Sequence, residues 1–125
     1  METEVWKPIS GFEKHYEVSN LGRVKRLTGF SAGQCLRPGI SGTKYPNVVL
    51  HVHNKRNTRR IHLLVAEAFL GPRPKGYEVN HKDGNKQNAA ASNLEYVTPS
   101  ENHLHAFRIG LRPSKRYLSL QALPS

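Results

Sequence analysis

The sequence predicts an α+β fold, with a small N-terminal antiparallel β-rich element followed by a strand–loop–strand–helix (ββα) unit. The first 57 residues hold short β-type runs separated by turn residues. A helical apolar period follows, and after it come strand, turn, strand and helix signals in that order. We expect three segments: the β-rich element over residues 1–57, a helix with the ββα unit over residues 58–111, and a basic, then apolar tail over residues 112–125.

The N-terminal element is divided by turn signals at Ser10-Gly11 and Asn20-Leu21-Gly22. Between these turns the residues have strand character, and residues 28–46 are rich in Gly, Ser and Pro. We therefore expect short strands over residues 4–27, followed by a loop or irregular hairpin. A small aromatic core is expected from Trp6, Phe12 and Tyr16.

The positive charge is large and uneven. The chain carries 19 Lys+Arg against 9 Asp+Glu, a formal net charge of +10. No acidic residue occurs from Val18 to Ala66. Positive side chains without carboxylate partners repel one another, so a nucleic-acid partner is favoured over a merely solvated basic face. The stretch contains Arg23, Lys25, Arg26, Arg37, Lys44, Lys55, Arg56, Arg59 and Arg60.

Composition excludes several other classes. One cysteine, Cys35, excludes an internal disulfide framework and an all-cysteine zinc site. No apolar run approaches the roughly 18–20 residues that a bilayer span needs, and the N-terminus lacks an apolar signal core. We expect a cytoplasmic protein without a membrane partner. Because no heptad or dimer face is evident, we expect a monomer or weak dimer.

A hairpin and a helix are predicted in the middle of the chain. Residues 48–53 alternate as in a strand, and Asn54-Lys55-Arg56-Asn57 is expected to turn the chain. His51 and His53 would share one strand face, where an exposed or DNA-facing role is favoured over metal binding. His62 lies off the apolar stripe of the helix and is either a packed polar residue or a DNA contact. The stripe consists of Ile61, Leu64, Val65, Ala68 and Phe69, and Gly71-Pro72 ends the helix.

The ββα unit has clear boundaries. Residues 78–81 are strand-like, Asp83-Gly84 is a strong turn pair, and residues 94–98 read as the returning strand. Thr98-Pro99-Ser100-Glu101 is a capping box with proline at the first helical position. The last helix is expected from Pro99 to Ile109, with Gly110 as its stop.

Polar side chains that could bind a metal or transfer a proton are concentrated in this unit. Asn80 and His81 end the first strand with opposite orientations, and Asn102 on the helix is expected to approach that strand end. Amide oxygens there would suit Mg or Mn, and a neighbouring histidine can deprotonate water. On spacing alone, turn-capping asparagines and an ordinary polar histidine explain the pattern equally well. The candidates are Asn80, His81, Asn93, Asn102 and His105.

The ordered set resembles a known family. It resembles the HNH nucleases, in the branch found with phage and intron homing endonucleases, at residues 80–86, residues 93–98 and Glu101-Asn102. The core of these nucleases is the ββα-metal motif. Residues 61–69 resemble the helix before that motif. Residues 5–9 and 16–24 resemble a modular DNA-binding element that commonly precedes it.

The resemblance implies a metal-dependent DNA endonuclease, expected to nick one strand of double-stranded DNA in the host cell of a phage or mobile element. It implies His81 as general base, Asn93 as a loop brace that helps orient it, and Asn80 and Asn102 as ligands of Mg or Mn. His105 is a secondary candidate. DNA contacts are expected from Arg23, Lys25, Arg26, Lys55, Arg56, Arg59, Arg60, Lys82 and Lys86.

Two positions depart from the family pattern. Asn80 supplies a neutral oxygen, so no carboxylate is evident in the ligand pair, and Asp83 is favoured as a turn residue. Ala89-Ala90-Ala91 occupies a loop that is usually more polar in relatives. The alternative functions are a non-catalytic DNA-binding module or regulator and a basic RNA-binding protein. The RNA reading is the weaker one because regularly spaced stacking aromatics are lacking.

Overall fold

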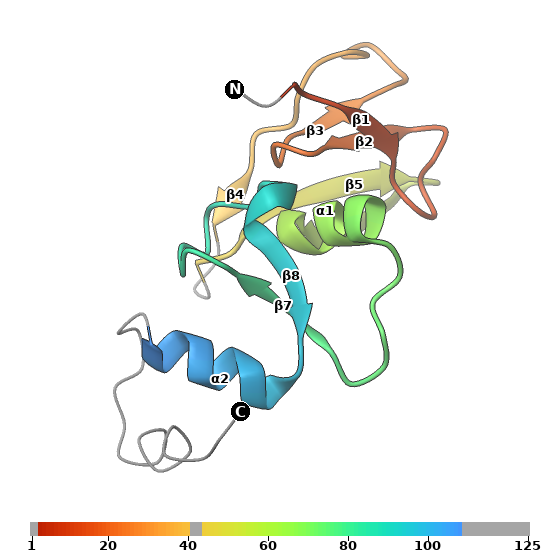
Figure 1. Cartoon of the computed structure of the whole chain (residues 1–125). Helices are drawn as coiled ribbons and strands as arrows, with labels where there is room; N and C mark the ends of the chain where they lie inside the picture. The colour runs from red at the N-terminus through yellow and green to blue at the C-terminus, as the bar shows by residue number, and fades with distance from the viewer. Residues whose placement is uncertain (1–2, 41–43, 109–125) are drawn as a thin grey trace.

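Three small antiparallel sheets surround the central helix α1, and helix α2 packs at the far end of the molecule (Figure 1). The computed structural model describes residues 3–40 and 44–108, so the expected C-terminal tail lies outside the described residues. The elements are β1 Trp6–Pro8, β2 Tyr16–Ser19, β3 Val24–Arg26, β4 Gly39–Ile40, β5 Pro46–Val52, β6 Lys55–Arg60, α1 Ile61–Leu70, β7 Glu78–His81, the 3-10 helix η1 Ala91–Asn93, β8 Leu94–Val97 and α2 Pro99–Arg108.

The sheet orders are β1-β2-β3, β4-β5-β6 and β7-β8. In the loop-rich region after β3, an isolated bridge joins Lys25 to Cys35 and the short β4 pairs with β5. The β7–β8 hairpin followed by α2 is the predicted ββα unit. This arrangement confirms the α+β class and the order of its two parts.

The turn of the β5–β6 hairpin differs from the prediction. Val52 pairs with Lys55, so the turn consists of His53 and Asn54, whose φ angles are 53° and 61°. Left-handed φ at both central residues is the signature of a tight two-residue hairpin turn. The predicted turn over residues 54–57 is therefore wrong, and Lys55 to Asn57 continue the strand. His53 consequently does not share a strand face with His51.

The core forms where α1 packs against the sheets. The apolar stripe of α1 is buried at Ile61, Leu64 and Val65, as its period predicts. Tyr16 is buried beside it and accepts a 2.9 Å hydrogen bond from the backbone N–H of His51. Tyr16 therefore ties the N-terminal sheet to β5.

The predicted aromatic core is only partly correct. The ring of Phe12 packs edge-on against Tyr16, with centroids 6.5 Å apart. Trp6 remains half-buried outside this core, and the Lys25 ammonium lies 4.3 Å from its ring centroid. Trp6 is therefore a surface platform for a cation rather than a core residue.

The alanines of the loop before η1 have a packing role. Gly22 has φ +91°, and a Cβ atom built there would lie 3.3 Å from Cβ of Ala89. The N–H of Ala91 donates a 2.7 Å hydrogen bond to the carbonyl of Asn20. Small side chains thus let this loop dock on the turn between β2 and β3.

The start of α2 follows the sequence signal closely. The N–H of Thr98 donates to Glu101 Oε1 at 2.9 Å, and the N–H of Glu101 donates to Thr98 Oγ1 at 3.3 Å. These reciprocal bonds confirm the capping box. The predicted stop at Gly110 lies outside the described residues. Within residues 3–40 and 44–108, neither helix is long and apolar enough to cross a membrane.

Candidate active site

Asn93 anchors the loop between β7 and β8. Its Oδ1 accepts a 3.0 Å hydrogen bond from the N–H of Asp83, and its Nδ2 donates to Asp83 Oδ1 and to the Asn88 carbonyl, each at 2.9 Å. The backbone carbonyl of Asn93 accepts from the N–H of Lys82 at 2.8 Å. Asn93 is therefore bonded to both residues that follow His81.

Asp83 belongs to the same network. Its carboxylate accepts hydrogen bonds from Asn88 Nδ2 at 2.9 Å and from the N–H of Asn85 at 2.8 Å. These bonds, that from Asn88 above all, hold the pKa of Asp83 below its usual range. The carboxylate thus organises the loop, in the turn role that the sequence favoured.

His81 lies at the end of β7, in a buried ring cluster. It is 5% exposed, and its ring centroid lies 5.0 Å from that of His62 and 5.6 Å from that of Tyr45. Burial lowers the pKa of His81, with Lys86 adding to this effect and Asp83 opposing it. The imidazole is therefore neutral at pH 7. Its Nε2 atom has no hydrogen-bond partner among the described residues.

His62 and Tyr45 complete the cluster and were not predicted as site residues. Their rings are stacked with centroids 4.6 Å apart. Burial, followed by the charges of His81, Arg60 and Arg73, lowers the pKa of His62 to about 4. His62 is thus packed against the candidate base. Its place off the apolar stripe was the available signal, whereas nothing in the Gly- and Pro-rich loop marked Tyr45.

Each candidate metal ligand is held by a carboxylate. Asn80 is buried and donates from Nδ2 to Glu95 Oε2 at 2.8 Å, directly across the β7–β8 ladder. Asn102 on α2 donates from Nδ2 to Glu78 Oε1. Both proposed ligands are still neutral amides, as the sequence indicated, but each amide contacts a carboxylate that the sequence did not reveal. Asn102 also meets the start of β7, not its end.

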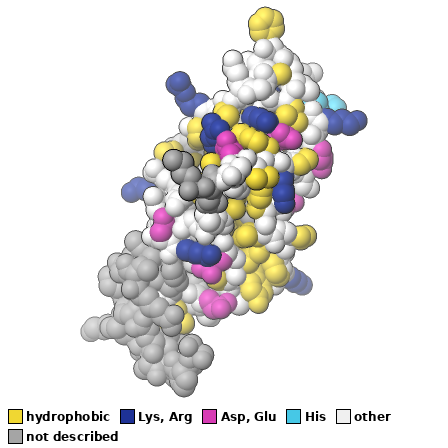
Figure 2. Space-filling model, turned by 45° about the horizontal axis from the view of Figure 1, so that its top comes forward, with side chains coloured by type: hydrophobic (Ala, Val, Ile, Leu, Met, Phe, Trp, Pro, Cys, Tyr) yellow, Lys and Arg dark blue, Asp and Glu magenta, His cyan; other side chains and the backbone are white. Residues whose placement is uncertain are grey.

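Two basic residues at the N-terminal sheet, Arg23 and Lys25, are paired with carboxylates. Arg23 binds Glu4 through two nitrogens, one of them Nε at 2.8 Å from Oε2, and Lys25 lies 3.4 Å from Glu17. Acidic side chains lie close to Lys and Arg on one face of the molecule (Figure 2). The assumption that the acid-free stretch lacks carboxylate partners is wrong here, because β1, β2 and β3 bring Glu4 and Glu17 alongside it.

Other cations lie over aromatic rings. Arg26 lies 5.9 Å from the Tyr16 centroid and Arg59 5.7 Å from that of Phe12. Arg60 and Lys86 lie 5.1 Å and 5.3 Å from that of Tyr45. Lys55, Arg56 and Lys82 are exposed. Within the described ranges, none of these cations forms an ion pair with a carboxylate. The side chain of His105 lies outside the described residues.

The ββα hairpin, with a buried histidine, a loop-bracing asparagine and an asparagine on its helix, defines a nuclease-type motif behind a β-rich module. A model described as HNH endonuclease matches residues 59–104, and the NUMOD4 motif matches residues 4–63. A solved structure of DNA binding and cleavage by the HNH homing endonuclease I-HmuI is similar, with a TM-score of 0.77 and 34% identity, covering 98% of this chain and 67% of that one. The chain belongs to the HNH endonuclease family.

Curated relatives support this family. DNA endonuclease I-HmuI of Bacillus phage SP01 is 39% identical over 97 residues, which is 78% of this chain and 54% of the relative. The SPbeta prophage-derived putative HNH homing endonuclease YosQ of Bacillus subtilis is 52% identical over 63 residues, which is 49% of this chain and 36% of the relative. The chain thus spans about half, or less, of these relatives.

Proposed function

We propose that the protein is a metal-dependent DNA endonuclease that hydrolyses phosphodiester bonds and nicks one strand of a duplex, with His81 as general base. The observation that carries this proposal is the neutral, buried His81, whose Nε2 has no partner among the described residues. Asn93 bonds the residues that follow it. The family and the I-HmuI similarity support the same function.

The chain's own residues supply the proton chemistry. A neutral imidazole accepts a proton from water, whose oxygen then attacks phosphorus while the bond from phosphorus to the 3′-oxygen breaks. The leaving 3′-oxygen takes a proton from solvent, so the products are a 5′-phosphate and a 3′-hydroxyl. Packing against His62 and Tyr45 restricts the ring of His81, which favours a single orientation for proton transfer.

HNH nucleases generally use a divalent metal ion, and the donor chemistry here fits one. Asn80 and Asn102 are the proposed ligands through their amide oxygens, because Glu95 and Glu78 occupy their amide nitrogens. Such oxygen donors favour Mg or Mn. A bound ion would stabilise charge that develops on the phosphate and leaving oxygen. Among the described residues, no group of three or more His, Cys, Asp or Glu side chains is arranged to hold a metal.

Double-stranded DNA is the proposed substrate, and the cations without carboxylate partners are its proposed contacts. Most of these side chains lie on β6 or in the loop after β7. Arg60 and Lys86 contact the ring of Tyr45. Their charge would bind phosphates and make affinity salt-dependent. A monomeric or weakly dimeric state and a place in the host cytoplasm remain predictions.

Nicking of a supercoiled plasmid in Mg, Mn or EDTA tests this function. We expect the parent to nick with a divalent metal and His81→Ala to lose about 10²–10⁴-fold of the rate, because the proton acceptor is gone. Its DNA affinity should survive. His51→Ala, at an exposed position on β5, is the matched control. Nicking by His81→Ala at the parental rate would contradict the assignment of His81 as general base. DNA binding without nicking by the parent would support the non-catalytic alternative.

A further inference from the structure

A polar cavity of about 370 Å³ lies beside the proposed active site. Its polar lining comes from β6, α1, the connector after α1 and α2, through Arg60, His62, Arg73 and Asn102. Tyr45 and Glu78 also line it. His81 and Asn80 do not line it, but His62 does, and its ring centroid lies 5.0 Å from that of His81, so an occupant would lie next to the proposed base.

The cavity holds more positive than negative charge. Arg60 and Arg73 line it, and neither forms an ion pair within the described part of the chain. Both lie close enough to His62 to lower its pKa. Glu78 is the acidic side chain of the lining, and its carboxylate accepts the Asn102 amide. Two guanidinium groups therefore remain available to an anion.

His62 adds a buried polar atom that has no protein partner. The side chain is 5% exposed, and its Nδ1 makes no hydrogen bond with the described residues. A buried polar atom without a partner costs free energy unless water or a ligand satisfies it. Because the ring contacts His81 as well as the cavity, an occupant would be coupled mechanically to the proposed base.

We propose that this cavity binds a phosphate of the substrate strand adjacent to the scissile phosphate, with Arg60 and Arg73 as its cationic ligands and His62 beside it. Guanidinium groups suit phosphate oxygens because they donate several hydrogen bonds in one plane. The position of this phosphate next to the scissile one rests on the proposed nuclease function. Binding of a strand phosphate in the cavity does not depend on that function, and it is measured without cleavage.

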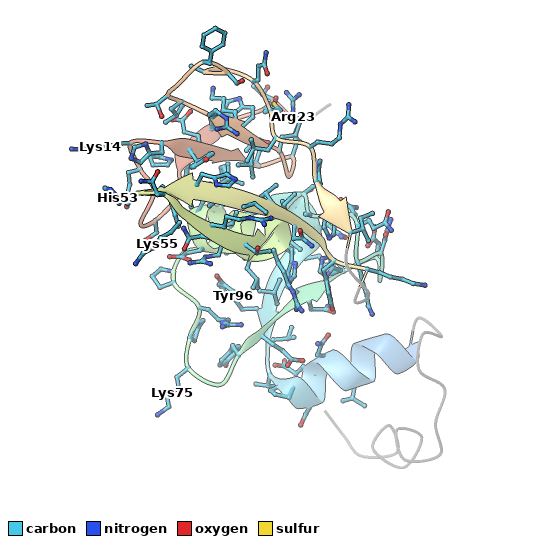
Figure 3. The ribbon with its side chains drawn as sticks, turned by 180° about the vertical axis from the view of Figure 1, so that it is seen from behind. Lys14, Arg23, His53, Lys55, Lys75 and Tyr96 are labelled. Atoms are coloured by element: carbon cyan, nitrogen blue, oxygen red, sulfur yellow. The ribbon has the colours of Figure 1, made fainter. Side chains whose placement is uncertain are left out.

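The experiment compares Arg73→Gln with Lys75→Gln in the full chain. Both changes remove one exposed cation from the same connector, and only Arg73 lines the cavity. Lys75 extends away from the body of the protein (Figure 3). Binding of a short DNA duplex is measured in EDTA by fluorescence anisotropy over a series of salt concentrations. Because this assay measures binding without metal or cleavage, failure of the parent to nick a plasmid would count against the nuclease proposal alone.

We expect Arg73→Gln to weaken binding about tenfold at low salt and to reduce the slope of log K against log salt by about 0.9, the value for one lost phosphate contact. Lys75→Gln should match the parent in both. Equal effects of the two substitutions would overturn the proposal, because the cavity would then contribute no more than any surface cation.

Histidine ring signals in nuclear magnetic resonance give a second readout. The duplex should shift the His62 signals in the parent but not in the Arg60→Gln/Arg73→Gln double variant. Inorganic phosphate alone should leave them in place, since the proposal needs a strand held by neighbouring cations. Unmoved His62 signals in the DNA-bound parent would overturn the proposal. Equal shifts with inorganic phosphate would overturn its assignment to a strand.

Discussion

The N-terminal sheet and the ββα unit use polar side chains in opposite ways. In β1–β3, Arg23 and Lys25 are matched by Glu4 and Glu17 and lie over Trp6 at the surface. In the ββα unit, asparagines and a histidine are buried, and the ring nitrogen of His81 has no described partner. Paired surface charges contribute little stability, whereas buried polar groups are costly unless they are satisfied or functional. The contrast supports the proposed location of the chemistry in the ββα unit.

The largest expected effect is a difference in stability between alanine substitutions of two asparagines, Asn93 in the ββα unit and Asn20 at the N-terminal sheet. Asn93→Ala removes a buried side chain and its three partly buried hydrogen bonds to Asp83 and Asn88, so we expect a loss of about 2–4 kcal/mol in the free energy of unfolding. Asn20→Ala removes bonds to Val5 and Thr3 in exposed surroundings, where water replaces them, and should cost about 1 kcal/mol. Urea titrations measure both. Equal losses would contradict the proposed difference between the two regions.

Acid should weaken the fold through His62. Its pKa is about 4 in the folded protein against 6.5 ordinarily, so the unfolded chain binds more protons between these values. Stability therefore rises with pH across this window and is lost as pH falls through it, by on the order of 3 kcal/mol. Urea midpoints measured across this window give the slope. His62→Gln should flatten it, and an unchanged slope in a folded variant would refute the role of His62.

Glu95 and Glu78, the carboxylates that bond the proposed ligands, should affect Mn²⁺ affinity more than surface carboxylates do. Glu95→Ala frees the Asn80 amide and removes a negative charge, so we expect Mn²⁺ affinity to fall about 10–100-fold. Glu17→Ala is the matched control, because it is also a half-buried strand residue but pairs with Lys25. Electron paramagnetic resonance of free Mn²⁺ measures the affinity without cleavage. A similar small change in both variants would count against Asn80 as a ligand.

The smallest effect should separate two arginines in DNA binding. Arg56→Gln removes an exposed cation without a described ion pair and should lower the salt slope by about 0.9. Arg23→Gln should lower it less, because Glu4 already engages that guanidinium. Anisotropy titrations at several salt concentrations compare them. A larger change for Arg23 would show that its pair with Glu4 opens on DNA.

Most of the elements could be predicted because their signals are local. The period of α1, the strands β7 and β8 and the Thr98–Glu101 capping box depend on residues within a few positions of each other. The hairpin turn was misplaced because Lys55 and Arg56 look like turn residues but pair across the sheet with Val52 and His51. Strand pairing, which is not local, decided that turn.

The candidate site was predicted in part for the same reason. Asn80, His81 and Asn93 lie in one ordered segment, so their grouping was visible in the sequence. Tyr45 and His62 lie far from His81 along the chain and reach it only when α1 packs against the β7–β8 hairpin. No periodicity joins these three rings.

The sequence by itself determined the order of elements, the helix start of α2 and the polar residues of the ββα unit, because short-range sterics, capping and hydrophobic period govern them. Only the tertiary structure decided which carboxylate meets which polar group. The β7–β8 register sets Glu95 opposite Asn80, and the N-terminal sheet brings Glu4 to Arg23. Such pairings depend on long-range packing, which also buries His81 and thereby keeps its imidazole neutral.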